Sequence, residues 1–421
     1  MTCSARIKAE TFDIMQYFYG SVHHPLIRCV LRFDGHIREE VLKNAVNLSI
    51  CSVPQLSCCF CARGWRPFWQ DCGFTAENMV SVTEEAADYD KQCEKLLTAA
   101  IDITSQPPLK ISLVKGESSD TLCITVHHML CDAAGFKEYL YLLCAYYNFC
   151  CGLGARPDSK PYSRRAGLLF SNMSFMERIR LLTSQYPVPG HEKQLTFSMQ
   201  GGSKPAFVFR GISADQFLRI KQNAKSRNAT VNDALLTAYI RVLHRELGLN
   251  SITVPCPVDL RKYLPAGCKY GITNLTSNYI CQIDFKENET FEETLKKVSD
   301  QMKQQKSDKR CLKGVFLLDF IFHMLPFPVL QRIFPKIFTI PVVSYSNLGI
   351  VDGGCLRFGN AAVQDVRMAA AVKKVPYFQL TVSTFDCCCC LNSNLYASEQ
   401  DKEKLKRILN EIEEELLVWL N

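Results

Sequence analysis

The segment that decides how this chain is interpreted is LCITVHHMLCDAAG, residues 122–135. Residues 121–128 predict a buried strand, and residues 136–149 predict a helix. His127 and His128 end the strand, and Asp132 lies in a tight turn four residues after the second histidine. Since successive side chains on a strand face opposite sides, only one of the two histidines can face a cleft.

The histidine pair allows three interpretations. Both rings could be buried core residues, His127 and His128 could bind a metal together with Asp132, or one histidine could act as a general base. The metal interpretation is disfavoured because neighbours on a regular strand cannot both reach one ion. A histidine at the end of a strand is held rigidly, which suits a base that must come within about 2.6–3.2 Å of the proton it removes.

Strand and helix signals alternate on both sides of a stretch rich in glycine and proline. We therefore expect residues 1–160 to form an N-terminal lobe that carries the histidine pair. Residues 161–203 are expected to be a linker or crossover, and residues 204–421 to form a C-terminal lobe. The expected fold class is α/β (α+β), with two lobes of similar size.

The spacing His127-His128-x-x-x-Asp132 resembles the HHxxxDG signature of the condensation-domain and chloramphenicol-acetyltransferase-like acyltransferases. Further stretches resemble that family in the same order along most of the chain, at residues 34–35, 230–236, 257–261, 271–278, 346–349 and 378–385. The resemblance implies two lobes, each a mixed sheet flanked by helices, with the active-site channel between them. The chain is similar to stand-alone members of alcohol acetyltransferase type, and the resemblance implies a role in secondary metabolism.

The resemblance also implies an activity. An acyl group would move from a CoA or carrier-protein thioester to an alcohol or amine, without a covalent acyl-enzyme. No cofactor would be resident, because acyl-CoA or a phosphopantetheinyl carrier enters as co-substrate. His128 would be the catalytic base and His127 would point back into its lobe. Asp132 would pair with Arg261 of the second lobe rather than with His128, since a buried carboxylate needs a partner.

Other positions complete the expected site. Gly135 would support its structure, and no metal is expected. Ala133 stands where the family usually has glycine, and its methyl group and backbone preference cast doubt on donor geometry there. The side chains or amides expected to bind the oxyanion or the substrate are those of Ala133, Asn274, Ser346 and Asn347.

Two alternative functions remain open. Ala133 mildly favours a catalytically degenerate module that binds a carrier protein or another partner. The apolar stretch 315–330, followed by Arg332 and Lys336, leaves open a membrane-associated acyltransferase of lipids or glycolipids. That stretch contains Asp319 and two prolines, so it predicts a buried or tunnel-lining helix rather than a membrane span. Membrane contact is accordingly not favoured.

Composition excludes several classes of protein. Apolar residues make up 47% and charged residues 22% of the 421, which excludes a disordered chain. The net charge of +7 is scattered, so no nucleic-acid partner is expected. The start of the sequence carries no apolar segment, so we expect a cytoplasmic protein whose 22 cysteines act as small buried apolar residues. The clusters at 58–61 and 387–390 are read as strands, with a metal or redox site as the less favoured alternative.

Overall fold

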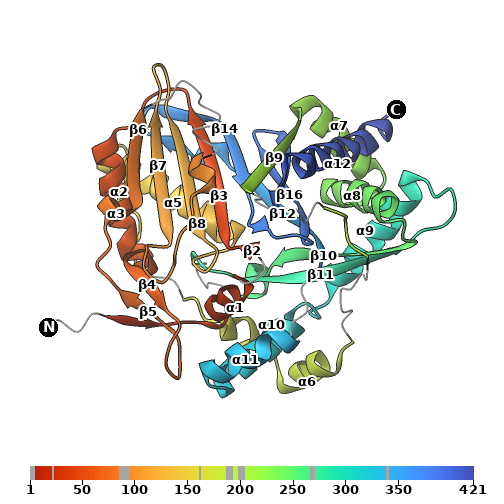
Figure 1. Cartoon of the computed structure of the whole chain (residues 1–421), viewed down its shortest axis with the longest axis horizontal. Coiled ribbons are helices and arrows are strands. Elements are labelled where there is room, and N and C mark those ends of the chain that lie inside the picture. The colour runs from red at the N-terminus through yellow and green to blue at the C-terminus, as the bar shows by residue number, and fades with distance from the viewer. Residues whose placement is uncertain are drawn as a thin grey trace.

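The computed structural model of the chain describes residues 5–20, 23–84, 95–160, 163–185, 193–197, 204–265, 271–337 and 341–421. Two lobes lie side by side, each built on a six-stranded mixed sheet with helices packed against it (Figure 1). The expected two-lobed mixed α/β architecture is confirmed. The sequence pattern at 86–100 predicts a helix, and residues 86–94 of that range lie outside the described part of the chain.

The N-terminal lobe is built around a sheet with the order β13-β14-β3-β8-β7-β6. Its strands are β3 (Leu26–Phe33), β6 (Val80–Glu84), β7 (Leu109–Lys115), β8 (Thr121–His127), β13 (Arg357–Phe358) and β14 (Ala361–Ala369). Every residue of β8 is buried, as expected for a central strand. Helices α2 (Glu39–Ser52) and α5 (Ala133–Cys150) pack against each other and, with the short α3 (Ala76–Met79), cover this sheet.

The C-terminal lobe has the strand order β12-β16-β17-β15-β2, with β9 added to β17. These strands are β2 (His23–His24), β9 (Lys204–Ile212), β12 (Val343–Val351), β15 (Val372–Lys373), β16 (Phe378–Phe385) and β17 (Cys388–Ala397). Its helices are α7 (Ala214–Ser226), α8 (Val231–Leu247), α9 (Phe291–Ser307) and α12 (Glu399–Val418). A separate antiparallel pair, β10 (Ser251–Asp259) and β11 (Thr276–Asp284), extends toward the lobe junction.

The local sequence accounts for these elements well. Helix α8 begins at Thr230, whose side chain accepts from the amide of Asp233 in a reciprocal capping box, and it ends at Gly248 in a left-handed conformation with φ of 60°. The sequence pattern at 378–396 predicts a hairpin, and the structure has the antiparallel pair β16–β17 there. The cysteine cluster at 58–61 is strand β4, as expected.

The two sheets exchange strands. Strand β14, late in the sequence, pairs antiparallel with β3 in the N-terminal sheet, and β2, early in the sequence, pairs with β15 in the C-terminal sheet. Each sheet therefore contains residues from both predicted lobe ranges, 1–160 and 204–421. The division of the chain into lobes at these boundaries remains a prediction.

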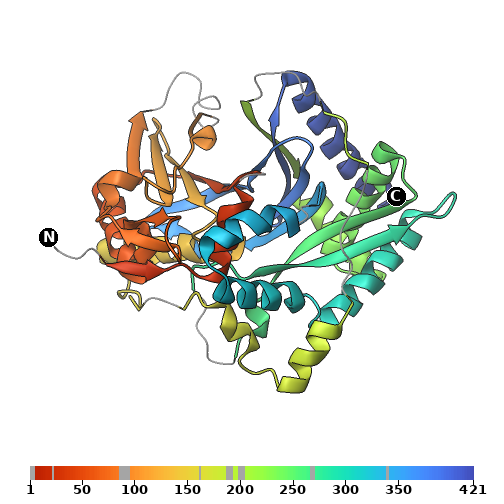
Figure 2. The same ribbon diagram turned by 60° about the horizontal axis from the view of Figure 1, so that its bottom comes forward.

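A third group of elements lies beneath the junction of the lobes (Figure 2). It comprises α1 (Thr11–Tyr19), the sheet β1 (Arg6–Lys8), β5 (Phe68–Asp71) and β4 (Cys58–Cys61), and the helices α6 (Phe175–Thr183), α10 (Leu312–Met324) and α11 (Phe327–Ile337). Within the described part of residues 161–203, the range predicted to be a linker or crossover, 3-10 turn η2 (Ala166–Phe170) and α6 both pack against α10.

The expectation of one buried or tunnel-lining helix at 315–330 is wrong in two respects. Pro326 divides the stretch into α10 and α11. Phe320 and Met324 of α10 are exposed by 61% and 63%, so the helix lies at the surface with apolar side chains exposed rather than buried. Within the described part of the chain, no helix combines the length and apolarity needed to cross a membrane.

Candidate active site

A cavity of about 440 Å³ lies where the lobes meet, with walls from both. This volume falls within the range of small-molecule sites. His128, Ala133 and Lys137 line it from the N-terminal lobe, and Ser346 and Lys373 line it from the C-terminal half of the chain. The end of strand β8 therefore places His128, the residue after it, at an accessible cavity rather than in a sealed core.

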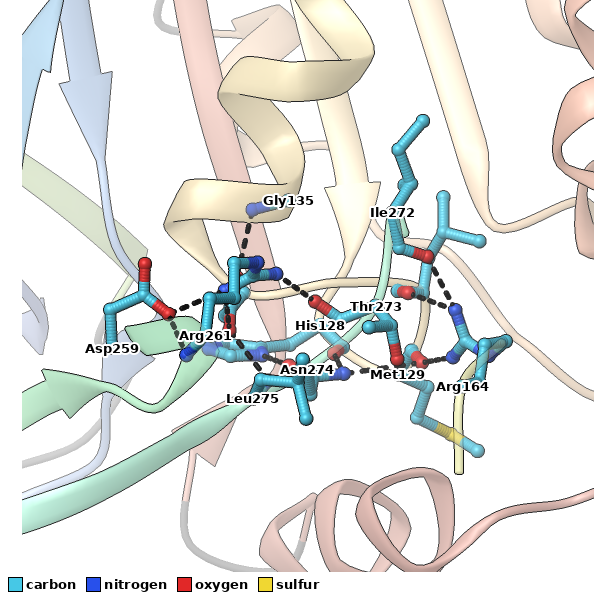
Figure 3. Close-up of polar contacts among 12 residues, drawn as sticks. His128, Met129, Gly135, Arg164, Asp259, Arg261, Ile272, Thr273, Asn274 and Leu275 are labelled. Atoms are coloured by element: carbon cyan, nitrogen blue, oxygen red, sulfur yellow. Dashed lines mark hydrogen bonds and ion pairs between the residues drawn. The ribbon is translucent and has the colours of Figure 1, made fainter. Parts of the chain in front are cut away.

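His128 is held in one ring orientation by Asn274 (Figure 3). The amide nitrogen of Asn274 donates to the carbonyl oxygen of His128 at 2.7 Å, which fixes which way the Asn274 amide points. Asn274 Oδ1 then lies 3.0 Å from Nδ1 of the His128 ring. Because an amide oxygen only accepts hydrogen bonds, Nδ1 carries the proton and Nε2 is left with a free lone pair.

Burial lowers the pKa of His128 below its ordinary value of 6.5. Three smaller effects oppose this lowering of the pKa without overcoming it: the backbone carbonyl of His128, the charge of Asp132 and the hydrogen bond to Asn274. The charge of Lys373 lowers the pKa further. The ring is therefore neutral at pH 7. A neutral imidazole with its lone pair available is the state that a general base requires.

His127 faces the other way. It is 4% exposed, its Nδ1 accepts the amide N–H of Met129 at 3.2 Å, and it does not line the cavity. Burial, together with the charge of His128, lowers the pKa of His127 to about 3. The alternation expected for neighbouring strand residues thus places one ring in the lobe and one in the cavity.

Asp132 joins the two lobes through its ion pair with Arg261. Both of its oxygens accept from Arg261, Oδ2 from Nη1 and Oδ1 from Nη2, each at 3.0 Å. Oδ1 also accepts from the amide of Gly135 at 2.8 Å, and Oδ2 from the amide of Leu275 at 2.7 Å. The ion pair expected from the sequence is present, and four donors satisfy this buried carboxylate.

Arg261 is 6% exposed, so its charge also needs compensation. Desolvation lowers the pKa of the guanidinium, but the adjacent charges and hydrogen bonds of Asp132 and Asp259 raise it above its ordinary value overall. Arg261 Nη2 also donates to the carbonyl of Thr273 at 2.8 Å. The pair therefore fixes the segment 273–275, which carries Asn274, against the turn that carries Asp132.

Gly135 permits the close approach of these segments. A Cβ at this position would lie 2.8 Å from the Thr273 carbonyl oxygen and 2.8 Å from Cys131 Cβ. Such contacts are shorter than packing allows, so any larger residue in this first turn of α5 would push α5 and the segment at 273 apart. The role of Gly135 as structural support follows directly from this contact.

The four residues expected to bind the oxyanion or the substrate lie in different settings. Ala133 and Ser346 line the cavity. Asn347 also lines it, but its side chain donates to Asn232 at 2.8 Å and accepts from the Gly349 amide at 2.8 Å. The expectation that Asn274 binds the oxyanion or the substrate is corrected. Asn274 is 0% exposed and does not line the cavity, because its side-chain amide donates to the carbonyls of His128 and Met129.

Arg164 is an important residue that the sequence did not single out. It lies in the presumed linker, yet it is 9% exposed. Its guanidinium donates to the carbonyls of Met129, Leu130 and Ile272 and pairs with Asp13 of α1 at 2.5 Å. Arg164 thus fastens the turn after the histidines to the segment before Asn274. A long-range contact of this kind leaves no local pattern by which it could be found.

Cysteine and metal chemistry receive no support from the geometry. No cysteine is among the residues that line the cavity. Within the described ranges, no three His, Cys, Asp or Glu side chains are gathered so as to hold a metal ion. Burial raises the pKa of Cys131, beside the active-site turn, so its thiol is not activated.

No protein-family model matches the sequence, and no curated protein matches it. Several solved structures do match the chain in fold. The first condensation domain of the calcium-dependent antibiotic synthetase, with a bound substrate analogue, is 14% identical with a TM-score of 0.72 over 98% of this chain and 97% of that domain. The epimerization domain of tyrocidine synthetase B is 14% identical with a TM-score of 0.71 over 99% and 96%.

A third likeness is to the trichothecene 15-O-acetyltransferase of Fusarium sporotrichioides. It is 12% identical with a TM-score of 0.69 over 99% of this chain and 96% of that enzyme. At such identities the likeness shows the fold alone, and proteins of different activity share it. The chain therefore has, over its full length, the two-lobed fold of condensation domains and of acyltransferases built in the same way.

Proposed function

We propose that the protein is an acyltransferase that moves an acyl group from a CoA or carrier-protein thioester to an alcohol or amine. The observation that carries this proposal is the state of His128. Its neutral ring has Nδ1–H held by Asn274, so that Nε2 is available in a cavity with walls from both lobes. The likeness to a condensation domain and to an O-acetyltransferase supports the same chemistry.

The reaction follows from that geometry. Nε2 of His128 removes the proton from the acceptor hydroxyl or amine as its oxygen or nitrogen attacks the thioester carbonyl. The tetrahedral intermediate then collapses, the C–S bond breaks, and the imidazolium returns the proton to the leaving thiolate. The Nδ1–H bond to Asn274 holds the ring through both proton transfers. Thioesters are already activated, so no resident cofactor is required in this scheme; acyl-CoA or a phosphopantetheinyl carrier is consumed as co-substrate.

The start of helix α5 is the proposed site of oxyanion stabilisation. Ala133 and Ala134 both line the cavity, and their amides precede the first intrahelical hydrogen bond. The positive end of the helix dipole lies at the same place. Donors aimed at the developing charge lower the barrier most when they are fixed in advance. Ser346, on the facing strand β12, is the remaining side-chain candidate.

Ala133 does not argue for a degenerate module. It is the first residue of α5 and is not among the described residues with positive φ. Glycine's conformational freedom is therefore not needed here, and the substitution adds only a methyl group to the cavity wall. The backbone argument for a non-catalytic carrier-binding module therefore does not apply to Ala133, and measured turnover tests that alternative directly.

The proposal is tested by incubating the protein with acetyl-, butyryl- and octanoyl-CoA and a panel of alcohols and amines. Thiol release should depend on the acceptor, and mass spectrometry should detect the acylated acceptor but no acylated protein. Release that is independent of every acceptor, or accumulation of an acyl-enzyme, would refute the mechanism.

An exposed apolar face favours a second candidate, the membrane-associated form of the same activity. Helices α6 and α10 contact each other and expose seven large apolar side chains, those of Phe175, Met176, Ile179, Leu182, Leu317, Phe320 and Met324. Exposed basic residues lie on the same layer, including Arg180 of α6 and Arg332 of α11. An apolar face with basic neighbours suits the interface of an anionic bilayer.

Vesicle co-sedimentation separates this candidate from the first. The protein should sediment with phosphatidylcholine vesicles that contain phosphatidylserine, and the double variant Phe175→Asp, Phe320→Asp should not. Val418→Asp, at an exposed apolar residue of α12, is the matched control and should bind like the wild type. Equal sedimentation of wild type and double variant would exclude an interfacial role for this face.

A further inference from the structure

A set of polar side chains that the proposed reaction does not use also lines the cavity. Lys373 of β15, His23 of β2 and Gln16 of α1 contribute to its wall. His23 and Lys373 are directly paired across the antiparallel strands β2 and β15. Directly opposed residues on such strands project to the same side, so these two side chains are neighbours.

Lys373 is a cation in the cavity without a matching anion. Among the described residues no carboxylate forms an ion pair with it, and its side chain has no hydrogen-bond partner there. Burial alone lowers the pKa of Lys373 to about 8, and no neighbouring acid offsets that shift. The group is still mainly an ammonium at pH 7. A desolvated charge left unpaired is costly, and such groups are normally found paired.

Two further polar atoms lack partners. His23 and Gln16 are 7% and 6% exposed, and His23 Nε2 and Gln16 Oε1 are buried without a hydrogen-bond partner in the described structure. Buried polar atoms are nearly always satisfied in native proteins, so a group of unsatisfied ones beside a cavity points to a ligand. Burial, aided by the Lys373 charge, keeps the pKa of His23 well below its ordinary value, so its neutral ring can donate one hydrogen bond.

We propose that Lys373 binds the carboxylate of the acyl acceptor, which is therefore a hydroxy acid or an amino acid. This inference rests on the proposed acyl transfer. Lys373 supplies the charge, and His23 can add a neutral donor. Gln16 Oε1 can accept a second hydrogen of the acceptor, from its amine or from a further hydroxyl, because the hydrogen on the attacking atom goes to His128. The CoA phosphates are not the anion, because the long pantetheine arm separates them from the thioester that must meet His128.

The test uses matched acceptors, each a hydroxy acid or amino acid compared with its own primary amide. With butyryl-CoA as donor at pH 7, the wild type should show a kcat/KM at least about tenfold higher for the acid, as a charge-assisted hydrogen bond predicts. Lys373→Met should lower the kcat/KM for the acid to the value for its amide. Lys373→Arg should retain part of the preference for the acid. Lys374→Met changes the exposed neighbouring lysine and should keep it fully.

Three controls make the outcome decisive. Lys373→Met should melt at a higher temperature than the wild type, because a desolvated ammonium has been removed; this excludes misfolding as the cause. Succinyl-CoA, whose acyl group carries a carboxylate, is compared with butyryl-CoA to test whether Lys373 binds the donor instead. If Lys373 affects kcat/KM only through a preference for succinyl-CoA over butyryl-CoA, the assignment of Lys373 to the acceptor is wrong. Calorimetry with the acid and amide on the His128→Ala variant measures binding without turnover.

The two proposals can fail separately. Turnover that does not prefer any acid over its amide overturns the carboxylate site and leaves acyl transfer standing. Lys373-dependent binding of an acid without turnover of any pair overturns acyl transfer and leaves the site standing. If neither the kcat/KM nor the calorimetric affinity is higher for the acid than for its amide, the inference about Lys373 is wrong.

Discussion

At His128, one amide decides which ring nitrogen faces the cavity. Asn274 donates to a backbone carbonyl and thereby presents its oxygen to Nδ1, which fixes the tautomer. The sequence predicted that one of two adjacent histidines would face a cleft, because strand geometry requires it. It could not predict the partner, since Asn274 lies 146 residues away and reaches the ring only through the packing of the lobes.

The pH dependence of turnover follows from the environment of His128. Burial disfavours the imidazolium, so the pKa of the base in the free enzyme lies below 6.5. Activity is lost when this group becomes protonated, so kcat/KM should fall on the acid side with a midpoint below pH 6.5. A midpoint at or above 6.5, measured with a non-titrating acceptor and donor, would show that burial does not control this ring.

The element that carries the site is the turn between β8 and α5, clamped by Arg261. Its sequence features were sufficient to predict a strand, a turn with Asp132 and a helix, because each has a local signal. The anchoring by Arg164 was not predictable, since it depends on three carbonyls from two segments that lie far apart in the sequence. The break between α10 and α11 follows from Pro326, but the exposure of α10 depends on tertiary packing.

The Asp132–Arg261 pair should be a strong contributor to stability. Asp132→Asn or Arg261→Met leaves one buried charge without its partner, which costs about 3–5 kcal/mol. Asp259→Asn is the matched control: the Asp259 side chain is 50% exposed and bonds the same guanidinium, so its loss should cost about 1 kcal/mol or less. The free energy of unfolding in urea measures all three. Equal effects of Asp132→Asn and Asp259→Asn would contradict the assignment of the main pair.

Gly135 tests the fit between α5 and the segment at 273. Gly135→Ala places a methyl group 2.8 Å from the Thr273 carbonyl oxygen, so the elements must separate. A loss of about 1–3 kcal/mol in unfolding free energy is expected for such overpacking. Gly154→Ala, in open space, should change it little. A Gly135→Ala variant as stable as the wild type would show that the two segments can move apart freely.

At the scale of the whole molecule, the lobes are joined by exchanged strands. The alternation of strand and helix signals predicted two mixed lobes, and the structure has them. The exchange of β14 and β2 was not predictable, because pairing between strands hundreds of residues apart has no local signature. This exchange places β2 and β15 together beside the cavity, so it also brings His23 to Lys373.

Histidine burial at the lobe junction predicts sensitivity to acid. Burial lowers the pKa of His24 to about 4 and of His127 to about 3, and lowers that of His23 well below 6.5. Between these values and the unfolded pKa near 6.5, the unfolded chain binds more protons, so stability falls as the pH drops below about 6.5. Urea unfolding at pH 7 and pH 5 should show the loss. It should be smaller in His127→Gln, and an identical loss there would exclude His127 as a contributor.

The most direct test of the account is the turnover of His128→Ala beside the wild type, with an acyl-CoA and acceptor pair identified in the panel. The account predicts a drop in kcat of about 10²–10⁴-fold with an unchanged melting transition. A His128→Ala protein that transfers acyl groups at the wild-type rate would contradict the central claim that this ring is the base.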